Sequence, residues 1–365
     1  MSTRSIPFIM LFAALASCVA PSQPTQRSAQ LPPPPPPVRQ VQPIPQPLAE
    51  ARRQEPPAGL SREIFELWRS FPGKTGISVQ RIDGRWTISQ RGDEYFPQQS
   101  VSKLWVAMTI LDQIDQGKVS LNDRVTIGRD DLTLFHQPLA ARVARQGEVT
   151  ETVRSLLEQA LTMSDNSAND ALLRHAGGPE AVRRFIARKN LGSIRFGPGE
   201  RLLQSRIAGL EWKQELSEGR RFQAARAQLP LESRRRALEA YVADPIDGAS
   251  PEAITEALSR LAREDLLSLS SSRLMLDILT RTHSGPNRLK AGVPAGWKFM
   301  HKTGTGQDLP PVSTGYNDVG IMVAPDGTRY AVAVMLGETT APIIERMKLM
   351  QAVTRAVARY HDMDR

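Results

Sequence analysis

The sequence has little of what builds disulfides or metal centres. Among its 365 residues there is one cysteine, Cys18, so no disulfide can form within the chain. Its five histidines do not pair at the spacing of metal ligands, and no H-E-x-x-H segment occurs. This argues against a zinc hydrolase, and no metal is expected.

The charge balance is basic but dispersed. Lysine and arginine number 47 against 38 acidic residues, which gives a formal net charge of +9. Such a balance suits an anionic membrane or cell-wall surface. Nucleic acid is the competing interpretation, but no nucleic-acid motif accompanies the scattered basic residues, so no nucleic-acid partner is expected.

Residues 1–20 are predicted to be an export signal. Arg4 supplies positive charge, and residues 6–16 form an apolar run too short to span a bilayer comfortably. The segment ending at Cys18 resembles the lipobox of bacterial lipoproteins, which implies a lipidated Cys18 as the mature N-terminus and a membrane anchor. The alternative is cleavage after Ala20, which would leave a soluble periplasmic protein.

Residues 21–57 are predicted to be a proline-rich, disordered linker. Six consecutive prolines follow Leu31, and three more come at alternate positions from Pro43. Proline removes backbone donors and favours extended polyproline II, so the segment could reach on the order of 100 Å. It would hold an enzyme away from a membrane, or act only as a spacer.

Residues 58–365 are predicted to fold as one catalytic domain. Alternating apolar residues and Asp-Gly turns predict strands over 77–81, 86–90, 296–302, 316–323 and 329–336. Helical periodicity predicts helices over 61–71, 101–116, 150–162, 166–176, 179–189, 232–241, 251–263, 270–282 and 343–360. The strands of both termini must then share one sheet around an inserted all-helical lobe, which is an α+β fold.

Three short motifs in the domain carry reactive side chains. In the first, Ser100 opens a predicted helix and Lys103 follows one turn later. A serine hydroxyl needs a base to become a nucleophile, and Lys103 could serve if burial lowers its pKa. The alternative is an N-cap serine beside an exposed lysine.

The other two motifs are S-D-N from Ser164 to Asn166, between predicted helices, and K-T-G from Lys302 to Gly304, at a strand end. Lys302 offers a positive charge for a substrate carboxylate, Thr303 and Thr305 offer hydroxyls, and Gly304 lets a substrate come close. Alone, these motifs could be a helix cap and a glycine-rich turn.

The order and spacing of the three motifs resemble the class A serine β-lactamases and penicillin-binding proteins. Residues 163–169, Gly177 to Pro179 and an aromatic at Phe96 follow the class A pattern as well. The resemblance covers about Ser61 to Tyr360. It implies the serine β-lactamase/DD-peptidase-like fold, with an antiparallel sheet.

The resemblance also implies roles. Ser100 would attack the amide, assisted by Lys103, or by Glu200 through a water, and the N–H groups of Ser100 and Thr305 would bind the oxyanion. Ser164 would pass a proton to the leaving nitrogen, and Asn166 would bind the substrate amide carbonyl. No metal or organic cofactor is needed.

Glu200 is the candidate base for deacylation. The family's E-x-x-L-N segment corresponds to Glu200 to Gln204, with glutamine in place of asparagine. By the resemblance, Glu200 would activate the water that clears the acyl-enzyme. The alternative is a solvated glutamate in a Gly-Pro-Gly loop.

Two features depart from the class A pattern. An extra basic segment, about 207–241, is expected to form one or two helices that reshape the active-site loop, bind an anionic polymer or lipid surface, or present a solvated face. Residues 316–320 also lack the arginine that many class A enzymes use to hold the substrate carboxylate.

The sequence therefore predicts an exported, monomeric serine β-lactamase. The first alternative is a penicillin-binding DD-peptidase that acts on peptidoglycan-like acyl-D-Ala substrates. The second is a non-catalytic, cell-envelope binding lipoprotein, against which the paired Ser100 and Lys103 argue.

Overall fold

The fold is built around one antiparallel sheet, in a computed structural model that describes residues 55–84 and 86–363. Its strands are β1 (Lys74–Arg81), β2 (Thr87–Gln90), β5 (Lys298–Gly304), β6 (Asp308–Leu309), β7 (Val312–Val323) and β8 (Arg329–Thr339). The order is β2-β1-β8-β7-β5, with β6 paired to β7. N-terminal β1 lies beside C-terminal β8, with Ile77 opposite Val334, so the predicted sheet of both termini is confirmed.

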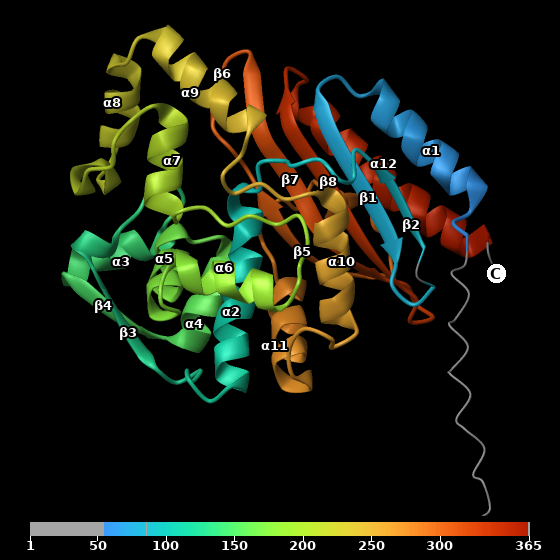
Figure 1. The fold of residues 1–365 in the computed structure, drawn as a ribbon, viewed down its shortest axis with the longest axis horizontal. Helices are drawn as coiled ribbons and strands as arrows, with labels where there is room; N and C mark the ends of the chain where they lie inside the picture. The colour runs from blue at the N-terminus through green and yellow to red at the C-terminus, as the bar shows by residue number, and fades with distance from the viewer. Residues whose placement is uncertain (1–54, 85, 364–365) are drawn as a thin grey trace, which may run out of the picture. The chain divides into compact units, whose positions relative to one another are not determined.

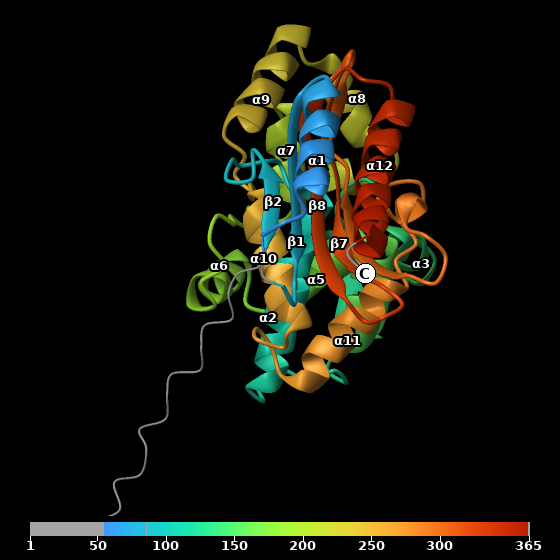
Figure 2. The same cartoon turned by 90° about the vertical axis from the view of Figure 1, so that its right-hand side faces the viewer.

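Helices cover both faces of the sheet (Figure 1). On one face lie α1 (Ala58–Ser70) and α12 (Ile343–Met363), side by side in Figure 2. On the other lie α10 (Pro251–Ala262) and α11 (Leu269–Thr280). Val332 and Val334 of β8 enter the core beneath α1 and α12, whereas Ala333 and Met335 enter the core on the other face. This alternation follows from the period of two along a strand.

The inserted lobe is mainly helical. It contains α2 (Lys103–Asp115), α3 (Pro138–Gln146), α4 (Val153–Glu158), α5 (Asn166–His175) and α6 (Pro179–Arg188). The first ten residues of α2 are all buried, so this helix forms the centre of the lobe. The helix predicted over 101–116 corresponds to α2. Its first two residues belong instead to a 3₁₀ turn, Gln99–Ser102, so the regular α-helix starts at Lys103.

The predicted helix over 150–162 is wrong at its N-terminal end. Residues up to Thr152 belong to β4 (Glu148–Thr152), which forms a hairpin with β3 (Arg124–Gly128). The threonines at 126 and 150 share a cross-strand hydrogen bond of 3.0 Å, and Thr152 then caps α4. Such pairing depends on a partner strand 24 residues away, which local helical periodicity does not register.

The basic segment is packed against the domain. It spans the end of α7 (Glu200–Ala208), then α8 (Arg221–Gln228) and α9 (Leu231–Ala243). Leu238, Tyr241 and Val242 of α9 bury themselves against α7, and Phe222 of α8 packs in a separate apolar cluster. The expected helices are therefore present, with an apolar side as well as a charged one.

Residues 1–54, with the predicted signal, Cys18 and most of the linker, lie outside the described part of the chain. Within the described part, no helix has both the length and the hydrophobicity that a bilayer crossing requires.

Candidate active site

The nucleophile motif is held by the turn that opens α2. Lys103 Nζ donates a hydrogen bond to Ser100 Oγ at 2.7 Å and another to Asn166 Oδ1 at 2.8 Å. The lysine is 1% exposed, and this burial lowers its pKa, although the carboxylate of Glu200 opposes the shift. This burial excludes the alternative of an exposed lysine. A buried amine with a lowered pKa can accept a hydroxyl proton.

Gln99 fixes the backbone directly before Ser100. It has a φ of +54°, in the left-handed region that non-glycine residues rarely adopt. The carboxylate of Asp247 accepts a hydrogen bond from the Gln99 N–H at 2.8 Å and so holds this conformation. Neither residue was singled out from the sequence, because their contact joins segments 148 residues apart.

The S-D-N motif stands at a break between two helices. A π-helical turn, Gln159–Met163, ends at Ser164, whose φ of +59° turns the chain into α5. The Asp165 carboxylate accepts hydrogen bonds from the N–H groups of Ala168 and Leu139, at 2.9 and 2.7 Å. Asp165 therefore ties the start of α5 to the start of α3.

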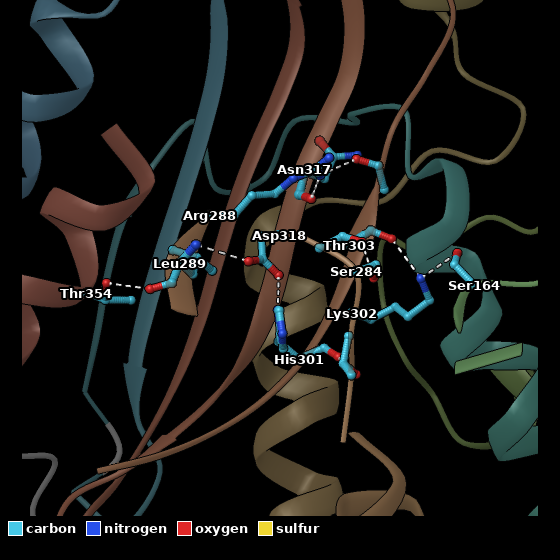
Figure 3. A network of polar contacts seen from close by, with 12 residues as sticks. Ser164, Ser284, Arg288, Leu289, His301, Lys302, Thr303, Asn317, Asp318 and Thr354 are labelled. Atoms are coloured by element: carbon cyan, nitrogen blue, oxygen red, sulfur yellow. Dashed lines mark hydrogen bonds and ion pairs between the residues drawn. The ribbon is translucent and has the colours of Figure 1, made fainter. Parts of the chain in front are cut away.

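The K-T-G motif closes the opposite wall at the end of β5. Lys302 Nζ donates to Ser164 Oγ and to the Thr303 carbonyl, both at 2.9 Å (Figure 3). Lys302 is fully buried, and burial, with Lys103 and Arg288 nearby, moves its pKa well below the usual value. A Cβ on Gly304 would overlap the carbonyl oxygen of Gln98, so glycine is required there.

An arginine that the sequence did not reveal completes this wall. The Arg288 guanidinium donates to the carbonyls of Gly304 and Asn317, at 2.8 and 2.6 Å, and to Thr305 Oγ1 at 2.6 Å. It lies 3.8 Å from the centroid of the Tyr316 ring. The expected arginine is absent from residues 316–320, but this cation arrives from the loop before β5.

The loop that carries Arg288 is anchored from behind the sheet. Asp318 of β7 accepts hydrogen bonds from the Leu289 N–H at 3.1 Å and from His301 at 2.9 Å (Figure 3). Thr354 of α12 donates to the Leu289 carbonyl at 2.9 Å. These contacts place Arg288 beside Thr305, although no local pattern around it signals such a position.

Glu200 begins α7 and faces the nucleophile motif. Its Oε1 accepts a hydrogen bond from Asn166 Nδ2 at 3.0 Å, and its N–H donates to the Asp170 carboxylate at 3.3 Å. The side chain is 9% exposed, and burial raises the pKa of its carboxyl, while Lys103 acts in the opposite direction. Glu200 is therefore not the solvated loop glutamate of the alternative interpretation.

The motifs surround one cavity of about 650 Å³. The predicted site residues that line it are Ser100, Ser164, Asn166, Glu200, Thr303 and Thr305. Lys103 and Lys302 lie behind this lining and reach it through their bonds to the two serines. Phe135 and Arg226 also line the cavity, so the basic segment contributes to its wall. No cluster of potential metal ligands occurs in the described residues.

Comparison with known proteins finds similarity to beta-lactamases. The beta-lactamase enzyme family matches residues 59–361. The extended-spectrum beta-lactamase PER-1 of Pseudomonas aeruginosa is 27% identical, over 82% of this chain and 85% of its own. A beta-lactamase of Streptomyces albus G is 26% identical, over 76% and 77%.

Solved structures agree on the fold. A beta-lactamase from Chitinophaga pinensis DSM 2588 superposes with a TM-score of 0.69 at 24% identity, over 83% of this chain and 99% of the other. The extended-spectrum beta-lactamase TLA-3 gives a TM-score of 0.68 at 21% identity, over 83% and 98%. Because the family matches nearly the whole folded region, the chain belongs to the beta-lactamase enzyme family.

Proposed function

We propose that this member of the family opens the β-lactam amide through an acyl-enzyme on Ser100 and then hydrolyses that intermediate. Lys103, bonded to the hydroxyl at 2.7 Å, takes its proton as the oxygen attacks the carbonyl carbon. The N–H groups of Ser100 and Thr305 stabilise the oxyanion, and each such donor contributes about a hundred- to a thousandfold in rate. Ser164 then relays the proton that Lys103 took to the lactam nitrogen as the C–N bond breaks.

Deacylation falls to Glu200, and its position is the observation that carries the proposal. Its carboxylate is buried in the cavity that contains Ser100, one hydrogen bond from Asn166, which Lys103 also contacts. The ionised carboxylate takes a proton from a water, whose oxygen attacks the ester carbonyl. The bond from the acyl carbon to Ser100 Oγ then breaks, the proton goes to Ser100 Oγ, and the ring-opened acid is released. Glu200, through a water, also remains a candidate base for acylation.

The side chains at the end of β5, together with Arg288, orient the substrate. Arg288 supplies positive charge, and the Lys302 amine and the hydroxyls of Thr303 and Thr305 supply hydrogen-bond donors, for the carboxylate of a β-lactam. Asn166 would hold the amide carbonyl of the acyl side chain.

A chromogenic cephalosporin tests the proposal against its two alternatives. Fast hydrolysis with only a transient acyl-enzyme in the intact mass supports a β-lactamase. Stable acylation without turnover would instead support a penicillin-binding DD-peptidase that takes acyl-D-Ala peptides. Neither acylation nor turnover would leave the non-catalytic binding lipoprotein.

Export and lipid anchoring complete the proposal. The apolar run at residues 6–16 and the lipobox-like segment ending at Cys18 support an exported, lipid-anchored protein with residues 21–57 as its tether. Palmitate labelling that is lost in Cys18→Ser would support the anchor, whereas labelling that persists would contradict it.

A further inference from the structure

A series of buried, hydrogen-bonded side chains joins the basic segment to the residue before Ser100 and to α7, the helix that begins at Glu200. It starts at Tyr241 of α9, whose hydroxyl donates to Asp247 Oδ1 at 2.8 Å and accepts from Gln99 Nε2 at 2.7 Å. Gln99 directly precedes Ser100, and its Oε1 accepts from Gln204 Nε2 at 2.8 Å. Tyr241 is thus two hydrogen bonds away from Gln204.

Gln204 lies one turn after Glu200 on α7. The Gln307 amide donates to its side-chain oxygen at 2.9 Å and to its carbonyl at 2.8 Å. Gln204 lines the same cavity as Glu200, and its amide lowers the pKa of the Glu200 carboxyl, against the larger opposing effect of burial. The orientation of the Gln204 amide is therefore set by Gln99 and Gln307, and Glu200 responds to it.

The chain depends on hydrogen bonds because its members are out of water. Tyr241, Gln99, Gln204 and Asp247 are all buried. Asp247 forms no ion pair with a described cationic side chain; its carboxylate accepts from Tyr241 and from the Gln99 N–H instead. Each buried polar group here needs its hydrogen-bond partner. Removing one donor therefore leaves the next group unsatisfied and free to change its orientation.

We propose that Tyr241 is a positioning residue for Glu200, and that the basic segment thereby sets the rate of deacylation. This inference rests on the proposed role of Glu200. The hydrogen bonds run from the Tyr241 hydroxyl through Gln99 to Gln204, which lies one turn from Glu200 on α7. Acylation is spared, because the bonds of Lys103 to Ser100 and Asn166 do not involve Tyr241, and the Gln99 N–H keeps its own bond to the other oxygen of Asp247.

The test is Tyr241→Phe, which removes the hydroxyl and keeps the ring packed against Leu203 and Leu238. A displaced catalytic group slows its step by about ten- to a hundredfold. We expect hydrolysis of the acyl-enzyme to slow about tenfold, with kcat and KM falling together and kcat/KM within about twofold of wild type. Tyr360→Phe on α12, across the sheet, is the matched control and should change neither constant.

Deacylation is followed by intact mass on acylated molecules alone, so a misfolded fraction does not enter the rate. The double variant Tyr241→Phe, Glu200→Gln should clear its acyl-enzyme at the rate of Glu200→Gln alone, because the tyrosine acts through the glutamate. Gln99→Met, which cuts the same path and leaves Tyr241 in place, should reproduce the defect.

An unchanged deacylation rate in Tyr241→Phe would overturn the inference, as would a further slowing in the double variant. Should Tyr241→Phe fail to fold, an unchanged rate in Gln99→Met would overturn it equally. If Glu200→Gln itself turns over normally, the proposed function fails as well. If Glu200→Gln traps the intermediate and Tyr241→Phe does not slow its hydrolysis, only this inference is lost.

Discussion

The carboxyl of Asp247 should make the stability of the domain depend on pH, and Asp247→Asn should remove that dependence. Its carboxyl is buried, and burial raises its pKa from 3.8 to about 6, more than its hydrogen bonds from Tyr241 and Gln99 lower it. The folded protein therefore binds this proton more tightly than the unfolded chain. Its contribution to stability is full below pH 3.8 and is lost as the pH rises to about 6.

The magnitude follows from the shift. About two pKa units correspond to about 3 kcal/mol of unfolding free energy, of which about 2 kcal/mol falls between pH 4 and pH 7. An asparagine side chain cannot ionise, so Asp247→Asn should lose this component. Urea unfolding of both proteins at pH 4, 5, 6 and 7 gives the difference profile. As the pH rises from 4 to 7, the unfolding free energy of the variant should increase by about 2 kcal/mol relative to that of wild type.

Exposed Asp93 offers the matched control, because Asp93→Asn makes the same chemical change at the surface. Its profile should run parallel to that of wild type. If the Asp247→Asn profile also runs parallel, within about 0.5 kcal/mol, the reasoning about this buried carboxyl is refuted.

Three further outcomes are expected. Arg288→Lys keeps the charge, but a lysine cannot bond to Gly304, Asn317 and Thr305 together. The KM for penicillins should therefore rise about tenfold in steady-state assays. The exposed control, Arg281→Lys, should leave KM unchanged. Gly304→Ala should lower kcat/KM at least tenfold, because its methyl group meets the Gln98 carbonyl; wild-type kinetics would contradict this crowding. Lys103→Met should slow acylation at least a hundredfold in stopped-flow experiments, and near-normal acylation would move the base to Glu200.

The sheet and the reactive motifs were predictable because their signals are local. Alternating apolar residues and the Asp326–Gly327 turn identify β7 and β8, and the motif at Ser100 carries its own spacing. The hairpin of β3 and β4 was missed, because most of its side chains are exposed or half-buried and the apolar alternation is weak.

The contacts that refine the site could not be predicted, because each is made by tertiary packing. Arg288 reaches Thr305 only once β5 and β7 pair, and no feature around it marks that role. Tyr241 looks like one more apolar position on a basic helix until α9 packs on α7. The sequence thus indicated a nucleophile and two bases, while the groups that orient them emerged from the fold.

The central claim is that an ester on Ser100 is hydrolysed by water that Glu200 activates. The most direct measurement is quenched-flow mass spectrometry of wild type and Glu200→Gln with benzylpenicillin, with peptide mapping of the adduct. We predict a stoichiometric adduct on the peptide that contains Ser100, transient in wild type and persistent in the variant. Clearance of the adduct at the wild-type rate in Glu200→Gln, or an adduct on another residue, would contradict the claim.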